Sequence, residues 1–199
     1  MEKYGFFGGS FNPVTKAHVE LAKEITNKYK LDKVIFVPVG DKYNKMGLVS
    51  EKHRYNMLKI AICKYDNLEV SNIELNQEKN LTTLEAFNMI EQKYPNVQKF
   101  YIMGADNVNK MILSSDFETL AKNYKYIIIE RDTVNSKELI RSNNELRKNE
   151  QNFTIMENIK HTETSATKAR EELQKDNGVS DVIDENVLDY IRINKLYTK

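Results

Sequence analysis

The sequence predicts an α/β fold built on a doubly wound parallel sheet, with a helical extension in the last third of the chain. Short apolar runs of strand length recur along the sequence, and most of them are continuously apolar rather than alternating. Such runs are typical of strands that are buried on both faces. The segments between them have helical periodicity, and strands that alternate with helices form right-handed βαβ units.

The elements follow from these patterns in chain order. Strands are expected at residues 4–7, 34–39, 68–73, 100–103 and 126–129, with a weaker candidate at 153–156. Helical stripes lie between them: Leu21, Ala22 and Ile25 form the first, and others span 55–62 and 84–90. From about residue 133 the chain becomes polar and helix-rich. We therefore predict a single domain, residues 1–199, in which part 133–199 packs on the sheet formed by the core, 1–132.

The composition describes a soluble globular protein and argues against several classes of function. Of the 199 residues, 40% are hydrophobic and 30% are charged, and the formal net charge is only +1. A general nucleic-acid or membrane-surface binder would show a basic excess. The sequence has no apparent secretion signal and no run near the ~20 apolar residues that span a bilayer. We expect a cytoplasmic protein without nucleic-acid or membrane partners.

The single cysteine, Cys63, excludes an internal disulfide. It adjoins the apolar stripe at 55–62, so we expect it in the core.

Ligands of doubly wound sheets bind beyond the carboxyl ends of the strands. That rule selects the loops at 8–18, 38–50 and 104–110. The first of these reads GGSFNPVTKAH and directly follows the first strand. Adjacent glycines, Gly8 and Gly9, allow a backbone N–H to approach an anion and permit positive φ.

The helix after this loop is expected to begin near Asn12 or Thr15. Its unpaired N–H groups and its dipole then face the same space, as they do at phosphate sites. His18 falls in the first turn, on the stripe that faces the sheet. The same spacing also fits an ordinary helix start, with Thr15 as the N-cap and His18 bonded to a backbone carbonyl. Spacing alone leaves both interpretations open.

Two motifs resemble those of the nucleotidylyltransferase superfamily, whose members share a Rossmann-like fold and transfer a nucleotidyl group from a nucleoside triphosphate. The segment Gly9-Ser10-Phe11-Asn12-Pro13, followed by Thr15-Lys16-Ala17-His18, resembles the G-x-F-x-P and [H/T]-x-G-H signature. The distant segment from Ser165 to Arg170 resembles S-x-T-x-x-R at the start of a helix. The two motifs stand in the expected order, roughly 150 residues apart.

Within the superfamily, the chain most resembles the bacterial nicotinate-nucleotide adenylyltransferases. The likeness covers 37–40, 54–57, 104–106, 187–191 and 196–197, besides Thr82 and Arg131. Three positions depart from the family pattern. Ala17 replaces a glycine, only Lys45 remains of a P-P-H-K segment, and Ser114 stands where the family has a ring-stacking tryptophan. Phe117 or Tyr43 is a candidate substitute for that platform.

The resemblance implies ATP as a substrate, Mg²⁺ held mainly by its phosphates, and no dedicated metal ligands in the protein. It implies that His18 and Thr15 donate to the α-phosphate and that Arg170 grips the β- and γ-phosphates. The acceptor would be the 5′-phosphate of nicotinate mononucleotide. Further nucleotide-binding residues implied are Gly8, Gly9, Ser10, Phe11, Lys45, Gly104, Asp106, Ser165 and Thr167, and substrate-binding residues are Thr82, Arg131 and Phe117.

Several of these residues also fit simpler structural interpretations. Asp106 also fits a helix N-cap, Lys45 a solvated loop charge, and Arg54 a surface residue at a helix start. His53 and His161 have no motif around them and are expected to be incidental.

The acceptor could instead be 4′-phosphopantetheine or nicotinamide mononucleotide. The chain could also be a degenerate module that binds a nucleotide without transferring it. A homo-oligomer is possible.

Overall fold

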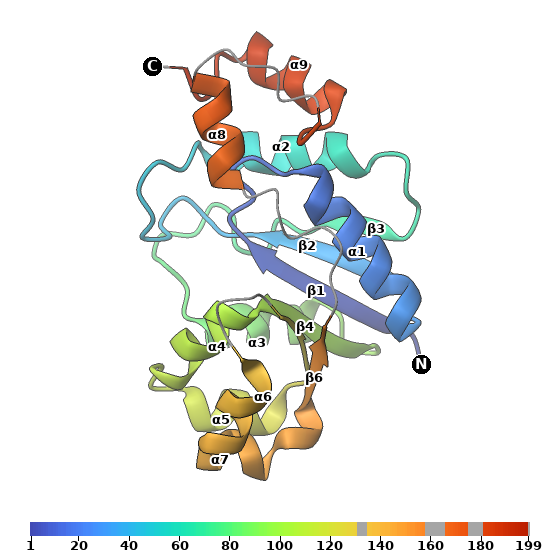
Figure 1. Cartoon of the computed structure of the whole chain (residues 1–199), viewed down its shortest axis with the longest axis vertical. Helices are drawn as coiled ribbons and strands as arrows, with labels where there is room; N and C mark the ends of the chain where they lie inside the picture. Colours follow the sequence, from blue (N-terminus) through green and yellow to red (C-terminus); the bar gives the residue numbers. More distant parts are fainter. Residues whose placement is uncertain (131–134, 158–165, 175–180, 199) are drawn as a thin grey trace.

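In this computed structural model, structure is described for residues 1–130, 135–157, 166–174 and 181–198. Within these ranges, six strands form one sheet in the order β3-β2-β1-β4-β5-β6, with every neighbouring pair parallel (Figure 1). The strands are β1 (Lys3–Gly9), β2 (Lys33–Pro38), β3 (Leu68–Val70), β4 (Gln98–Gly104), β5 (Tyr126–Ile129) and β6 (Phe153–Met156). All six predicted strands are present, and β3 is shorter than expected.

The predicted helical stripes also form helices. The helices are α1 (Lys16–Tyr29), α2 (Glu51–Ile62), α3 (Thr83–Lys93), α4 (Ala105–Ile112), α5 (Phe117–Asn123), α6 (Ser136–Ser142), α7 (Asn144–Lys148), α8 (Ala166–Gln174) and α9 (Glu185–Ile193). Their starts follow from local chemistry. Thr15 and Thr82 each close a capping box at the first turn of α1 and α3, which satisfies amide groups that a helix start leaves unpaired.

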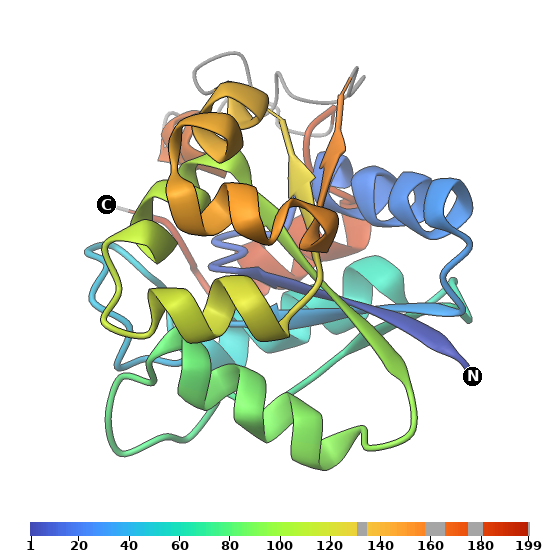
Figure 2. The same ribbon diagram turned by 90° about the horizontal axis from the view of Figure 1, so that it is seen from below.

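Helices cover both faces of the sheet, as Figures 1 and 2 show. Neighbouring strand residues point to opposite faces, so Phe7 joins one hydrophobic core and Phe6 the other. The core on the Phe7 side includes residues of α1, α2, α8 and α9. The core on the Phe6 side includes residues of α3, α4, α5, α6 and α7. The fold is therefore the expected doubly wound α/β arrangement.

The described segments after residue 133 pack on the same sheet. β6 extends the sheet by pairing with β5, and Ile191 of α9 lies in the core that α1 and α2 share. The backbone N–H of Lys16 donates to the carbonyl of Val182 (2.8 Å), which joins this part to the start of α1. Among the described residues, no helix is both long enough and apolar enough to cross a membrane.

The strand order places a topological switch point between β1 and β4. β2 and β3 lie on one side of β1, whereas β4, β5 and β6 lie on the other. In doubly wound sheets, ligands bind at such a point, where the loops after the two central strands diverge at their carboxyl ends. The β1–α1 loop and the start of α4 are the segments that follow the two strands at this point.

Cys63 is exposed, so its expected place in the core is wrong. α2 ends at Ile62, and Cys63 is the residue that follows its last turn. The buried stripe ends with Ala61 and Ile62, and the next position turns toward solvent.

Candidate active site

The glycine pair belongs to the end of β1 rather than to the loop after it. Gly8 and Gly9 pair in register with Val37 and Pro38 of β2. Neither has positive φ; that conformation is found at Phe11, with φ of 44°. Strand pairing keeps both glycines extended, so the positive φ that glycine permits is not used here.

The two glycines differ in their surroundings. A Cβ built at Gly8 would meet no atom within 4 Å, whereas one at Gly9 would lie 3.0 Å from the Phe11 ring. The protein itself therefore leaves space beside Gly8, at the switch point of the sheet. At Gly9, an added Cβ would crowd the Phe11 ring.

Thr15 is the N-cap of α1, and His18 completes the cap with its ring. The Thr15 backbone N–H donates to His18 Nδ1 at 3.0 Å, and the Thr15 hydroxyl lies 2.8 Å from the same nitrogen. A backbone N–H can only donate, so Nδ1 must offer its lone pair. The neutral imidazole consequently carries its proton on Nε2. Phe11 holds the ring from the side, edge-on, with centroids 5.3 Å apart.

The start of α1 is only partly available to a ligand. The Lys16 N–H bonds to Val182, and the His18 N–H points back to the hydroxyl and carbonyl of Thr15. Two of the backbone N–H groups that a helix start would offer to an anion are therefore already bonded. Binding of an anion here would depend on side chains as well.

Lys45 contacts Ser10, and charged side chains of α4 and α8 act on it there. The Lys45 ammonium donates to Ser10 Oγ at 3.0 Å. Burial of this ammonium lowers its pKa, and the positive charges of Arg170 and Lys110 lower it further, while Asp106 acts in the opposite sense. Charged residues up to 125 positions away in the chain therefore act on Lys45 at this place.

The three cations of this cluster have no ion-pair partner among the described residues. Arg170 donates to the backbone carbonyl of Asn12 (2.7 Å) and to Thr167 Oγ1 (3.1 Å). Lys110 donates to the side-chain oxygen of Asn107 (3.1 Å). Across the described ranges, no carboxylate forms an ion pair with Lys45, Lys110 or Arg170. We refer to these three residues as the cation cluster.

Sequence analysis missed Lys110, although the signal was present. Lys110 lies four residues after Asp106 on α4, so the two side chains share one face of the helix. Asp106 itself is not the N-cap of α4, because Gly104 occupies that position.

The expectation that Arg54 is a surface residue is wrong: its side chain is completely buried. Its Nε donates to the carbonyl of Val49 (2.9 Å) and its Nη1 to that of Ser10 (3.1 Å). Burial lowers the pKa of the guanidinium, and Asp41, 3.5 Å away, opposes that effect. The spacing of Arg54 to Met57, Leu58 and Ala61 already marks the buried face of α2.

The remaining predicted residues lie outside these contacts or outside the described residues. Thr82 caps α3, and its hydroxyl accepts the Glu85 N–H at 3.2 Å. Phe117 begins α5 and packs against the core on the Phe6 side of the sheet. Ser165, Arg131 and His161 fall outside the described residues. His53 contacts Tyr190, with Nδ1 2.9 Å from its hydroxyl.

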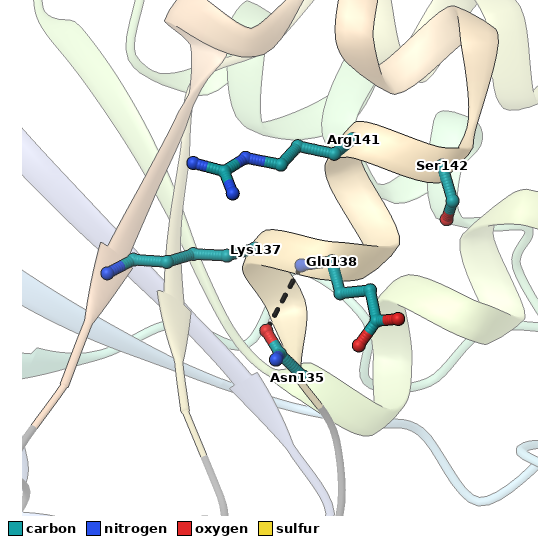
Figure 3. Close-up of a pocket in the computed structure, with 5 residues that line it drawn as sticks. All are labelled: Asn135, Lys137, Glu138, Arg141 and Ser142. Carbon is teal, nitrogen blue, oxygen red and sulfur yellow. Dashed lines mark hydrogen bonds between the residues drawn. The ribbon is translucent and has the colours of Figure 1, made fainter.

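A cavity of about 510 Å³ lies beside α6, lined by Asn135, Lys137, Glu138, Arg141 and Ser142, none of which is a predicted site residue. Figure 3 shows that Lys137 and Arg141 extend to one side of the helix, while Glu138 and Ser142 point to the other. Lys137 is also paired with Glu157 (2.6 Å). These side chains do not converge on a ligand.

A second cavity, of about 160 Å³, lies between α1, α2 and α9, and Thr15 and Val187 are among the residues that line it. In the part of the chain that the structure describes, no group of three or more His, Cys, Asp or Glu side chains could hold a metal ion.

Comparison with known proteins gives a consistent result. Residues 6–172 match the model of the cytidylyltransferase-like family. A probable nicotinate-nucleotide adenylyltransferase of Carboxydothermus hydrogenoformans is 32% identical, and the alignment covers 98% of both chains. Its counterpart in Clostridium tetani is 27% identical over 99% of this chain and 100% of that protein.

Among solved structures, Plasmodium falciparum nicotinic acid mononucleotide adenylyltransferase complexed with NaAD is similar in fold. Its TM-score is 0.79 at 23% identity, with 99% of this chain and 98% of that chain covered.

Proposed function

The chain belongs to the cytidylyltransferase-like family, and we propose that it transfers the adenylyl group of ATP to nicotinate mononucleotide. The products are nicotinate adenine dinucleotide and pyrophosphate, and the reaction serves NAD biosynthesis. The full-length relatives named as nicotinate-nucleotide adenylyltransferases support this choice of acceptor. We further propose that residues 1–199 act as one cytoplasmic nucleotidylyltransferase domain.

The cation cluster is the observation that carries the proposal. Lys45, Lys110 and Arg170 lie at the switch point of the sheet with no carboxylate partner among the described residues. Three such charges favour a ligand that carries several negative charges in a small volume. The triphosphate of ATP is a ligand of that kind, and Arg170 offers it a planar fork of donors.

The proposed reaction is an in-line displacement. An oxygen of the nicotinate mononucleotide 5′-phosphate attacks the α-phosphorus of ATP, and the bond from that phosphorus to the bridging oxygen breaks. The electron pair leaves with pyrophosphate. The attacking oxygen is already anionic, so the step needs positioning and charge stabilisation rather than a general base.

His18 is suited to stabilise the charge that develops on the α-phosphate. Since Nδ1 accepts from Thr15, Nε2 carries the proton that the imidazole can donate. The cap and the Phe11 ring fix the direction of that donor before substrate binds. We assign Thr15 a supporting role in this geometry and assign Ser10, with the backbone at Gly8, Gly9 and Phe11, to phosphate binding.

Among the described residues, Asp106 is the acidic group that acts on Lys45. This donor set suits phosphates and not a bare divalent cation. We therefore propose that Mg²⁺ enters with ATP, bound mainly by phosphate oxygens, and that it neutralises part of the triphosphate charge.

Further roles remain proposals made from the family resemblance. Gly104 and Asp106 would contact the nucleoside, and Ser165 and Thr167 would join Arg170 on the terminal phosphates. Thr82, Arg131 and Phe117 would contact the two nucleotides.

An acceptor panel tests the function. Pyrophosphate release is followed with ATP and nicotinate mononucleotide, nicotinamide mononucleotide or 4′-phosphopantetheine in turn. We expect turnover with nicotinate mononucleotide and a mass matching the adenylylated product. Turnover with another acceptor alone would replace the proposed substrate, and release with none of them would leave a nucleotide-binding module.

A further inference from the structure

Asn12 is the centre of a buried network that the proposed reaction does not use directly. It lies in the β1–α1 loop and is only 3% exposed. Its Nδ2 donates to the carbonyl of Gly47 (2.8 Å), and its Oδ1 accepts the N–H of Val49 (3.1 Å). These two bonds fasten the β1–α1 loop to the loop that carries Lys45.

Arg54 also connects these two loops by hydrogen bonds. It donates to the carbonyl of Val49 in one loop and to that of Ser10 in the other. The Lys45–Ser10 hydrogen bond (3.0 Å) runs between the same two loops. The geometry of the cation cluster therefore depends on buried side chains that lie beneath it.

A third contact comes from the segment after α9. The hydroxyl of Tyr197 donates to Asn12 Oδ1 at 2.8 Å, across 185 positions of sequence. The Tyr197 ring packs against the core on the α1 side, and burial raises the pKa of its hydroxyl, which stays a donor. Arg170 donates to the backbone carbonyl of the same Asn12 (2.7 Å). Asn12 therefore links Tyr197 to both the Lys45 loop and Arg170.

We propose that Tyr197 is a positioning residue of the phosphate site. Its hydroxyl acts through Asn12 and holds the β1–α1 loop where Ser10, Lys45 and Arg170 reach one anion. The hydroxyl is already bonded to Asn12 Oδ1, so this role requires no contact with substrate. The inference rests on the proposed function only in taking ATP as that anion.

Two conservative variants test the proposal. Tyr197→Phe removes the hydroxyl and keeps the packed ring. Tyr190→Phe is the matched control, because the Tyr190 hydroxyl bonds to His53 (2.9 Å) and Asn56 (3.0 Å), away from the β1–α1 loop. The measurements are the dissociation constant of a non-hydrolysable ATP analogue, by titration calorimetry, and the melting temperature.

We expect Tyr197→Phe to weaken binding of the analogue about five- to tenfold, the effect of one lost hydrogen bond. Tyr190→Phe should stay within about twofold while losing as much or more thermal stability, since its hydroxyl makes two bonds. A purely structural role for Tyr197 predicts a lower melting temperature with unchanged affinity, and that result would overturn the proposal.

The pathway through Asn12 has its own test. If Tyr197 acts through Asn12, the double variant Tyr197→Phe/Asn12→Ala binds the analogue no more weakly than Asn12→Ala alone. Additive losses would contradict that pathway. Should Asn12→Ala not fold, the comparison with Tyr190→Phe still decides. A wild-type protein that binds the analogue but adenylylates nothing refutes the proposed function and leaves this comparison intact.

Discussion

His18→Asn separates the structural function of the imidazole from its proposed chemical function. The imidazole uses Nδ1 to accept the Thr15 N–H at 3.0 Å, and the opposite nitrogen, Nε2, carries its proton. An asparagine side chain places an acceptor oxygen near the position of Nδ1 and has no group that reaches as far as Nε2. The variant should therefore retain the capping box of α1 and lose the donor to the α-phosphate.

The expected magnitudes differ for the two functions. Loss of a preorganised donor to transition-state charge lowers kcat by about 10²- to 10³-fold. Loss of a helix cap costs about 1 kcal/mol of unfolding free energy. His18→Asn should show the first effect alone, whereas His18→Ala should show both.

The assay follows pyrophosphate release at saturating ATP and nicotinate mononucleotide, together with thermal unfolding of each variant. ATP-analogue affinity is the control, and it should change far less than kcat in His18→Asn. A His18→Asn enzyme that kept the wild-type kcat would refute the assignment of Nε2 as the donor. Equal loss of stability in both variants would instead refute the deduced role of Nδ1.

Three further predictions use other features of the site. Lys110→Met should weaken ATP-analogue binding about fivefold at low ionic strength and less at high salt. Lys28→Met, at the far end of α1, is the control and should leave the affinity unchanged. Equal loss of affinity in both variants would contradict a role of the cation cluster in binding. Gly8→Ala should impair analogue binding without lowering the melting temperature, because the added Cβ meets no protein atom. Burial raises the pKa of Glu74 to about 7 from its usual 4.5, so ionising it costs stability as pH rises through that window. Glu74→Gln should therefore stabilise the protein by about 1–3 kcal/mol at pH 8 and much less near pH 5, by chemical denaturation.

The fold could be predicted because its signals are local. Continuous apolar runs such as Tyr126–Ile129 reappear as strands that are buried along their whole length. Thr15, one of the two residues near which the first helix is expected to begin, is the N-cap of α1. The predicted burial of Cys63 is wrong because an apolar stripe does not indicate at which residue its helix ends.

The site could be predicted only in part, because its decisive contacts are long-range. Lys45 and Ser10, which lie in two loops that the strand ends select, meet across 35 positions of sequence. The burial of Arg54 depends on carbonyls of Ser10 and Val49 that the packing of two loops presents to it. Tyr197 contacts Asn12 across nearly the whole chain. No local pattern encodes such a pairing.

The charge distribution explains how a protein of net charge +1 can select a polyanion. Elsewhere on the described surface, many lysines are paired with carboxylates, as Lys23 is with Glu20 and Lys137 with Glu157. The cation cluster has no such partners in the ranges that the structure describes. Burial lowers the pKa of Lys45, and the positive charges of Arg170 and Lys110 lower it further. Binding a monophosphate would leave part of this repulsion in place, whereas a triphosphate would relieve it for all three cations at once. The site should therefore discriminate ATP from AMP by phosphate count, through the placement of three side chains rather than through overall charge.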